Sequence, residues 1–141
     1  MRITKLTVIT LFCSLLALQA QADSLAVIVN TQNSNNLDER TIRQIFLGQI
    51  NTFPDGLETR TFDTTQEGDL RSDFITKVLR RNENTMNAYW ARMIFTARAT
   101  PPQELPDSAA VKQAVANTRG GIGYIATSAV DDSVRVILTI D

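Results

Sequence analysis

Residues 118–126 read TRGGIGYIA, and this stretch decides the fold because an expected helix ends here and an apolar strand begins. Gly120 and Gly121 follow an alanine-rich run, and glycine just past a helical pattern favours the left-handed backbone that ends a helix. Arg119 is expected in the last helical turn, where a cation suits the negative end of the dipole. Gly123 interrupts the strand, which indicates that another backbone or a ligand approaches closely. The stretch is therefore either a helix stop with tight packing or the wall of a ligand cleft.

Strand-like and helix-like segments alternate on both sides of this stretch. The apolar run 25–29 predicts a strand covered on both faces, whereas the alternating pattern of 134–140 predicts a strand with one wetter face at a sheet edge. Pro101 and Pro102 predict an extended linker that runs to Pro106. The remaining predicted elements are a helix capped by Asn36, a strand at 59–63, a helix carrying Leu70 to Leu79, a helix capped by Asn84, and a helix capped by Asp107 or Ser108. This order predicts an α/β fold with a mixed or mostly parallel sheet and helices on both faces.

The clearest helical pattern carries apolar side chains at offsets 0, 3, 4, 7 and 8, namely Met86, Tyr89, Trp90, Met93 and Ile94. Its aromatic residues can be interpreted as core or as a stacking platform for a ligand. Core is the commoner role for such a stripe.

The first 22 residues have the order of an export signal. Arg2 and Lys5 are followed by an apolar run over 6–18 and by a small-x-small cleavage site at 20–22. The apolar run is too short to span a bilayer comfortably, so no stable membrane anchor is expected. Lipid attachment at Cys13 is not expected, because Phe12 stands where a small residue is required. We therefore predict a signal peptide at 1–22, a single periplasmic domain at 23–141, and no disulfide.

Composition excludes several classes of function. Without the signal, 12 basic and 15 acidic residues give a net charge of −3, which is no nucleic-acid footprint. The chain has no histidine, and its one cysteine lies in the predicted signal, so histidine acid-base catalysis, thiol nucleophiles and the usual zinc sites are excluded. Carboxylates are present, but no spacing pairs them as in a catalytic site. We expect neither an enzyme nor a cofactor or metal.

A polar loop follows the predicted strand at 59–63. Residues 63–69 read DTTQEGD and precede the next predicted helix. Open α/β sheets bind ligands in such loops, between a strand and a helix N-terminus.

Four motifs carry a resemblance to a family. The motifs IFLGQI at 45–50, FPDG at 53–56, YWARMIF at 89–95 and GGIGYI at 120–125 resemble the phosphate-type periplasmic substrate-binding proteins of ABC importers. They occur in the family's order and span nearly all of the mature chain. The resemblance implies a type 2 periplasmic binding protein-like fold. Full members have two lobes with the ligand between them, whereas this chain resembles a single lobe.

The resemblance also implies a location for the ligand. The family holds an oxyanion partly with a Ser-Gly-Thr-type turn at a helix N-terminus, and the matching residues here are 66–71, without those hydroxyls. Glu67 and Asp69 suit the helix dipole as an ordinary capping turn and would repel an anion. The donors that remain form the expected ligand-binding set, with Gly121 on the cleft wall: Thr64, Thr65, Gly68, Arg71 and Gly121.

Two function classes remain open from the sequence. The first is an exported solute-binding module for phosphate or a similar oxyanion, weak in affinity and linked to ABC-type phosphate uptake. The second is a periplasmic protein-interaction module that keeps one lobe of the fold without the ligand. In either case a protein partner or a second copy can close the cleft.

Overall fold

The computed structural model describes residues 24–65 and 68–141. The predicted signal peptide and Cys13, together with Gln66 and Glu67, lie outside the described residues. None of the described helices is long and apolar enough to cross a membrane. The elements are β1 (Leu25–Asn30), α1 (Glu39–Phe46), β2 (Arg60–Thr64), α2 (Leu70–Lys77), α3 (Glu83–Phe95), β3 (Gln103–Leu105), α4 (Ser108–Ala116), β4 (Gly121–Ala126), a 3-10 turn (Thr127–Ala129) and β5 (Val134–Ile140).

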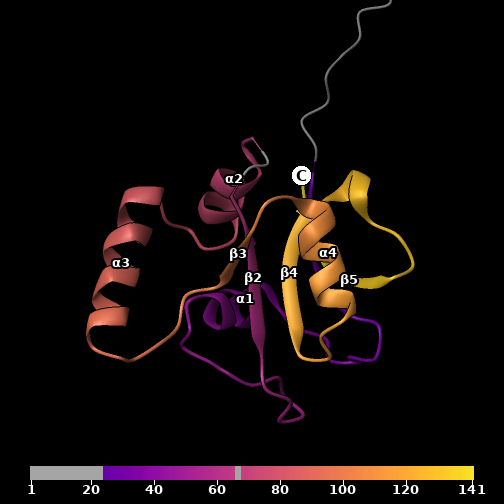
Figure 1. Ribbon diagram of the computed structural model, residues 1–141, viewed down its shortest axis with the longest axis horizontal. Coiled ribbons are helices and arrows are strands. Elements are labelled where there is room, and N and C mark those ends of the chain that lie inside the picture. Colours follow the sequence, from indigo (N-terminus) through magenta and orange to yellow (C-terminus); the bar gives the residue numbers. More distant parts are fainter. Residues whose placement is uncertain (1–23, 66–67) are drawn as a thin grey trace, which may run out of the picture.

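Five strands form one mixed sheet in the order β3-β2-β4-β1-β5 (Figure 1). The strand β2 runs parallel to β3 and β4, and β1 runs antiparallel to β4 and β5. The predicted mixed α/β sheet is confirmed, as is the position of 134–140 at a sheet edge. The strand β3 lies within the segment after Pro101 and Pro102 that the sequence predicted to be an extended linker. It was not predicted as a strand because three residues give too short a pattern to distinguish a strand from an extended linker.

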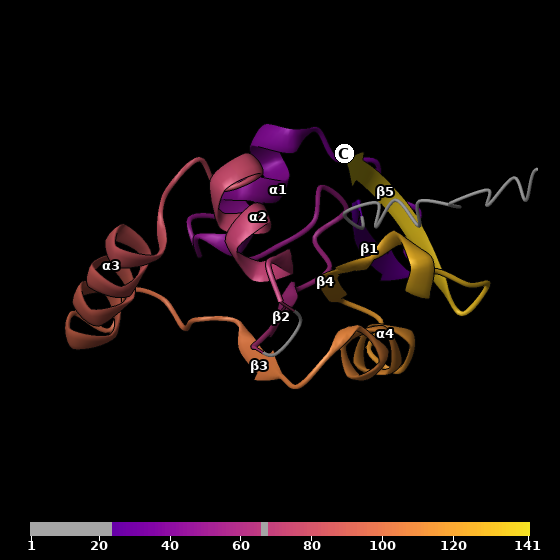
Figure 2. The same ribbon diagram turned by 90° about the horizontal axis from the view of Figure 1, so that it is seen from above.

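Helices cover both faces of the sheet, as predicted (Figure 2). On one face, α1, α2 and α3 enclose a core with the alternate residues Leu25, Val27 and Val29 of β1. On the other face, α4 packs through Val111 and Val115 onto Ala26 and Ile28. Every residue of β1 is buried, which is why its sequence is apolar from Leu25 to Val29, and the buried Asn30 side chain donates to the Val115 carbonyl oxygen at 3.0 Å.

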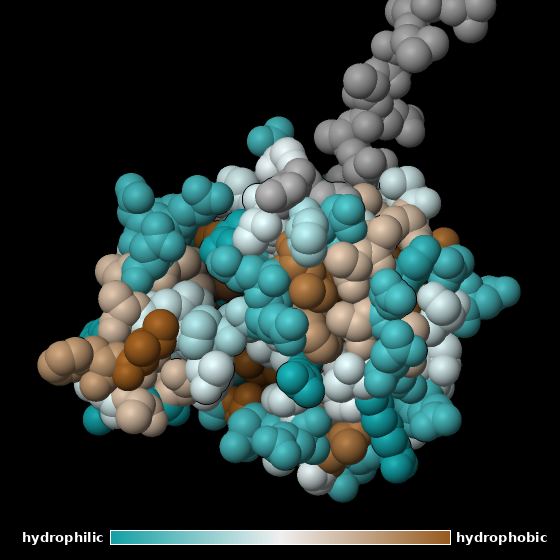
Figure 3. Space-filling view, in the orientation of Figure 1, coloured by the Kyte–Doolittle hydropathy of each residue, from teal (hydrophilic) through white to brown (hydrophobic). Residues whose placement is uncertain are grey.

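The helix α3 lies at the outer edge of the first layer. Met86 and Tyr89 are buried, and Trp90 packs against the core with its ring edge-to-face on Tyr89. The stripe is therefore mainly core. Towards the end of the helix, Ile94 and Phe95 are exposed, and Figure 3 shows the resulting hydrophobic surface on its left side.

The glycines of 118–126 serve a different purpose from the one predicted. Gly120 and Gly121 do not have positive φ, and Arg119 lies beyond the last turn of α4, which ends at Ala116. A Cβ atom on Gly120 would lie 2.0 Å from the carbonyl oxygen of Glu58, and one on Gly123 would lie 2.6 Å from Cγ1 of Val111. Glycine is therefore required at these positions because other protein atoms approach closely, and not because the backbone is left-handed.

Two helix caps also differ from the prediction. Asp38, not Asn36, caps α1 by accepting a hydrogen bond of 2.8 Å from the Thr41 N–H. Asn82, not Asn84, caps α3 through a reciprocal pair of hydrogen bonds with Thr85. The cap of α4 is Asp107, one of the two predicted candidates. Runs with several Asn and Asp residues offer alternative caps a few positions apart.

Candidate functional site

Strand direction brings several chain segments to one end of the sheet. The register pairs Leu25 at the start of β1 with Ala126 at the end of β4 and with Ile140 at the end of β5. Because β2 is parallel to β4, its last residue Thr64 points to the same end. Ser24 Oγ donates a 3.1 Å hydrogen bond to Asp141 Oδ1, so the loop after β2 shares this end with the first and last described residues.

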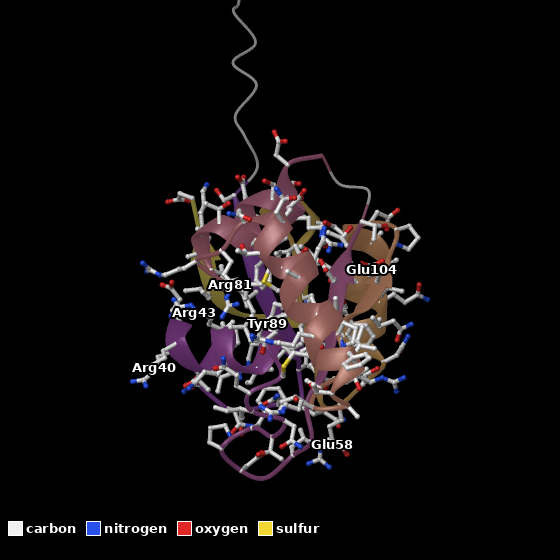
Figure 4. All side chains as sticks on the ribbon, turned by 90° about the vertical axis from the view of Figure 1, so that its left-hand side faces the viewer. Arg40, Arg43, Glu58, Arg81, Tyr89 and Glu104 are labelled. Atoms are coloured by element: carbon white, nitrogen blue, oxygen red, sulfur yellow. The ribbon has the colours of Figure 1, made fainter. Side chains whose placement is uncertain are left out.

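A group of charged and polar side chains lies below the β2–α2 loop. The Arg71 guanidinium donates to the Glu104 carboxylate at 3.0 Å and lies 3.4 Å from the Asp63 carboxylate. Asp63 in turn accepts a hydrogen bond from the Tyr124 hydroxyl. Figure 4 shows Glu104 on the β3 side of the molecule. Arg71 thus stands between two carboxylates that compensate its charge.

Burial shifts the pKa values of Asp63 and Tyr124 in this cluster. Desolvation raises the pKa of Asp63 above its ordinary value, against the opposing effects of the Tyr124 hydroxyl and the Arg71 charge. Burial and the neighbouring Asp63 charge raise the pKa of the Tyr124 hydroxyl. Tyr124 is therefore a hydrogen-bond donor at neutral pH. Its ring stacks on Phe74 at a centroid distance of 3.9 Å, which fixes the hydroxyl under the loop.

The loop between β2 and α2 presents hydrogen-bond donors. Thr64 is fully buried, and its hydroxyl has no hydrogen-bond partner among the described residues. Thr65 is exposed, with its hydroxyl 3.4 Å from the Leu105 carbonyl oxygen. Gly68 has a φ of 49°, and Asp69 at the N-cap of α2 forms no side-chain cap. Asp69 therefore does not cap the first N–H groups of α2, and N–H groups at a helix start can bind an anion.

Four of the five predicted ligand-binding residues lie in or beside the β2–α2 loop, although the Thr64 side chain is buried: Thr64, Thr65, Gly68 and Arg71. Gly121 lies elsewhere, because the register pairs it with Arg60, four residues before Thr64. At about 3.3 Å per residue, this is roughly 13 Å along β2. Gly121 is therefore not part of the group at the β2–α2 loop.

Sequence reasoning missed three members of the charged group, Asp63, Glu104 and Tyr124. Asp63 and Tyr124 stood in motifs already singled out, at the end of the predicted strand and in the GIGY stretch. Glu104 gave no signal, because it lies in the unpredicted strand β3.

A small pocket lies behind Arg71, between Asp63 and the rings of Phe74 and Trp90. Its volume is about 20 Å³, which is room for about one water molecule. Any larger ligand must therefore bind on the outer surface of the loop, over Thr65 and Gly68.

Comparison with known proteins gives a clear result for the fold. No family model matches the chain, and no curated protein matches its sequence. Among solved structures, a chain from Clostridium perfringens assigned as a phosphate ABC transporter substrate-binding protein, with bound phosphate, is 21% identical over 82% of this chain and 44% of its own, with a TM-score of 0.62. An ABC-type phosphate transport receptor from Vibrio cholerae is 21% identical over 82% and 45%, with a TM-score of 0.59. PstS from Borrelia burgdorferi is 13% identical over 82% and 46%, with a TM-score of 0.60.

This chain spans less than half the length of each of these proteins, although most of it is matched. The likeness agrees with the resemblance that the four sequence motifs carry. The chain therefore has the fold of phosphate-type substrate-binding proteins, in a form that fits a single lobe.

Proposed function

We propose that this protein is an exported module that binds phosphate or a similar oxyanion weakly at the β2–α2 loop. The observation that carries the proposal is the start of α2, where Asp69 forms no side-chain cap and where the exposed Thr65 and the Arg71 guanidinium lie close by in the chain. The fold of this chain also supports the proposal, because one of the structures with a similar fold contains bound phosphate.

The proposed site combines three kinds of donor. The first-turn N–H groups of α2 supply the positive end of a helix dipole. The exposed hydroxyl of Thr65 adds a neutral donor, whereas the predicted donor Thr64 is buried beneath the loop, and Gly68 lets the backbone approach an anion closely. Arg71 supplies the positive charge, and an anion would contact it by displacing Glu104, whose side chain is 57% exposed.

The nearby carboxylates limit the affinity with which one copy of the chain alone binds phosphate. Two or three charge-assisted hydrogen bonds contribute about 1.5–3 kcal/mol each. They must offset an association cost of at least about 4 kcal/mol, while Asp63, Asp69 and Glu104 oppose the anion. We therefore expect a dissociation constant no better than about 1 mM, near −4 kcal/mol.

A partner protein or a second copy of the chain that covers the loop would raise the affinity for phosphate. We propose that a protein partner or a second copy closes the site in the periplasm, as part of ABC-type phosphate uptake. The loop lies at the same end of the sheet as Ser24 and Asp141, so a protein bound at this end would face the hydrogen-bond donors of the proposed anion site.

One observation favours the alternative function, a protein-interaction module without a ligand. Arg71 already has two carboxylate partners, so the charge that an anion needs is compensated within the chain. In this alternative the same end of the sheet contacts a protein, and no oxyanion competes for it.

Calorimetric titration with phosphate and sulfate distinguishes the two functions. Thr65→Val should weaken phosphate binding severalfold with little effect on stability, because Thr65 is exposed. Arg71→Ala should weaken it further. Arg119→Ala is the matched control, since Arg119 is exposed at the opposite end of the sheet and should leave binding unchanged. Absence of binding in the unmodified protein would favour the interaction module, and micromolar binding that survives Arg71→Ala would exclude the proposed site.

A further inference from the structure

A large groove lies at the opposite end of β2 from the oxyanion site. Its volume is about 1080 Å³, and it is bounded by the end of α1, residues 58–61, the end of α3 and the segment that leads into β3. Figure 4 shows Glu58, which lines the groove, at the lower end of the molecule and well below Glu104. The groove is thus separate from the β2–α2 loop, and what it binds is independent of anion binding.

The walls of the groove are held in place. The Tyr89 hydroxyl donates a 2.5 Å hydrogen bond to the Leu47 carbonyl oxygen, which ties α3 to the end of α1. Gly48 adopts a φ of 68°, and a Cβ atom there would lie 2.6 Å from Cβ of Ala99. The segment after α3 is therefore packed directly against the end of α1. A ligand would enter a groove that is already formed, which reduces the ordering cost of binding.

One side of the groove offers an incomplete strand pairing. β2 pairs with β4 through Arg60 and Thr61, but β3 begins opposite Phe62. On the β3 side, the described chain places no strand beside residues 60–61. Pro101 and Pro102, which precede β3, have no N–H groups with which to extend it. An extended peptide can add main-chain pairing at this position.

The opposite side of the groove exposes apolar side chains. Ile94 lines the groove with 58% of its surface exposed, and the adjoining Phe95 is 91% exposed. Exposed large apolar side chains at or next to a formed groove are typical of interaction sites. Ile94 would contact a large apolar side chain of a bound segment.

Charge specifies the kind of segment. Arg60 and Arg98 line the groove, and neither forms any of the ion pairs found among the described residues. Glu58 is the only acidic side chain among the described lining residues. The groove therefore presents two uncompensated arginines beside an apolar wall and an open strand edge. We propose that it docks an extended segment of a partner protein in which a large apolar residue is flanked by Asp or Glu.

The test uses a display library of random decapeptides, followed by fluorescence anisotropy with a labelled synthetic copy of the most enriched peptide. Enriched peptides should combine Asp or Glu with Leu, Ile or Phe. Ile94→Asp and Arg98→Glu should each weaken binding at least tenfold. Both residues lie outside the core, so the variants should fold, which circular dichroism checks.

Arg92→Glu is the matched control. Like Arg98→Glu, it replaces a positive charge by a negative one. Arg92 lies on α3, but at 100° per residue its side chain points about 160° away from Ile94. The control should bind the peptide as the unmodified protein does. Absence of enrichment, enrichment of peptides without acidic residues, or equal loss in Arg92→Glu would overturn the proposal. Binding to anionic phospholipid vesicles with the same dependence on Ile94 and Arg98 would also overturn it, in favour of a membrane surface.

Discussion

The contact between Gly123 of β4 and Val111 of α4 allows a quantitative test of how the sheet and its helix are packed. Gly123→Ala would place a methyl group 2.6 Å from Cγ1 of Val111, whereas carbon atoms in contact lie about 3.5–4.0 Å apart. Overpacking of this kind costs about 1–3 kcal/mol. Replacing glycine within a strand regains about 0.5–1 kcal/mol by reducing the freedom of the unfolded chain. We expect a net loss of roughly 1–2 kcal/mol.

The second variant, Val111→Ala, removes the methyl groups that collide with the new side chain. Alone it should cost about 2–3 kcal/mol, for two buried carbon atoms at about 0.8 kcal/mol each and the cavity that remains. In the double variant, the methyl group of residue 123 fills part of that cavity. The double variant should therefore be no less stable than Val111→Ala, with a favourable coupling of about 1 kcal/mol or more.

Urea unfolding followed by circular dichroism measures all four free energies, and equal slopes against denaturant check that the comparison is valid. Gly56→Ala is the control, because Gly56 has a φ of 90° and nothing lies within 4 Å of an added Cβ atom. It should lose stability through backbone strain and combine additively with Val111→Ala. If Gly123→Ala also combines additively, within about 0.5 kcal/mol, the proposed packing of α4 on β4 is wrong.

Three further predictions concern stability and export. Gly121→Val should lower the melting temperature by several degrees through collision with the Thr118 carbonyl oxygen, 2.9 Å from an added Cβ atom, and an unchanged melting curve would contradict this. Asp63 holds its proton more tightly in the folded protein, so the stability of the unmodified protein relative to Asp63→Asn should rise as the pH falls from 7 towards 4. Urea unfolding at both pH values measures this, and a difference that stays constant or falls would contradict the raised pKa. Intact mass of secreted protein should show a chain that begins at Asp23, and a mass that retains residues 1–22 would disprove the predicted cleavage.

Local patterns were sufficient to predict most of the elements. The apolar run 25–29, the alternation of 134–140 and the helical stripe from Met86 each reflect burial on a definite face, which the sequence records directly. The torsion of Gly121 could not be predicted, because glycine occurs both at left-handed positions and where another chain segment approaches closely.

The candidate site depends on contacts that no local pattern contains. Arg71 and Glu104 are 33 residues apart and meet only because β3 pairs in parallel with β2. The sequence therefore indicated the donors Thr64, Thr65 and Arg71 and the opposing Asp69, but not the Asp63 and Glu104 carboxylates that compensate Arg71. Likewise, the position of Gly121 relative to the loop follows from strand register, which a single sequence does not reveal.

The most direct test of the proposed function is an amide nuclear magnetic resonance titration of the protein with phosphate. We predict progressive shifts of the amide resonances at Thr65 and at 68–71, with half-saturation at about 1 mM or above, and no comparable shift at Gly121. Unchanged resonances at 68–71 when other amides shift, or no change anywhere at tens of millimolar phosphate, would contradict oxyanion binding at the β2–α2 loop.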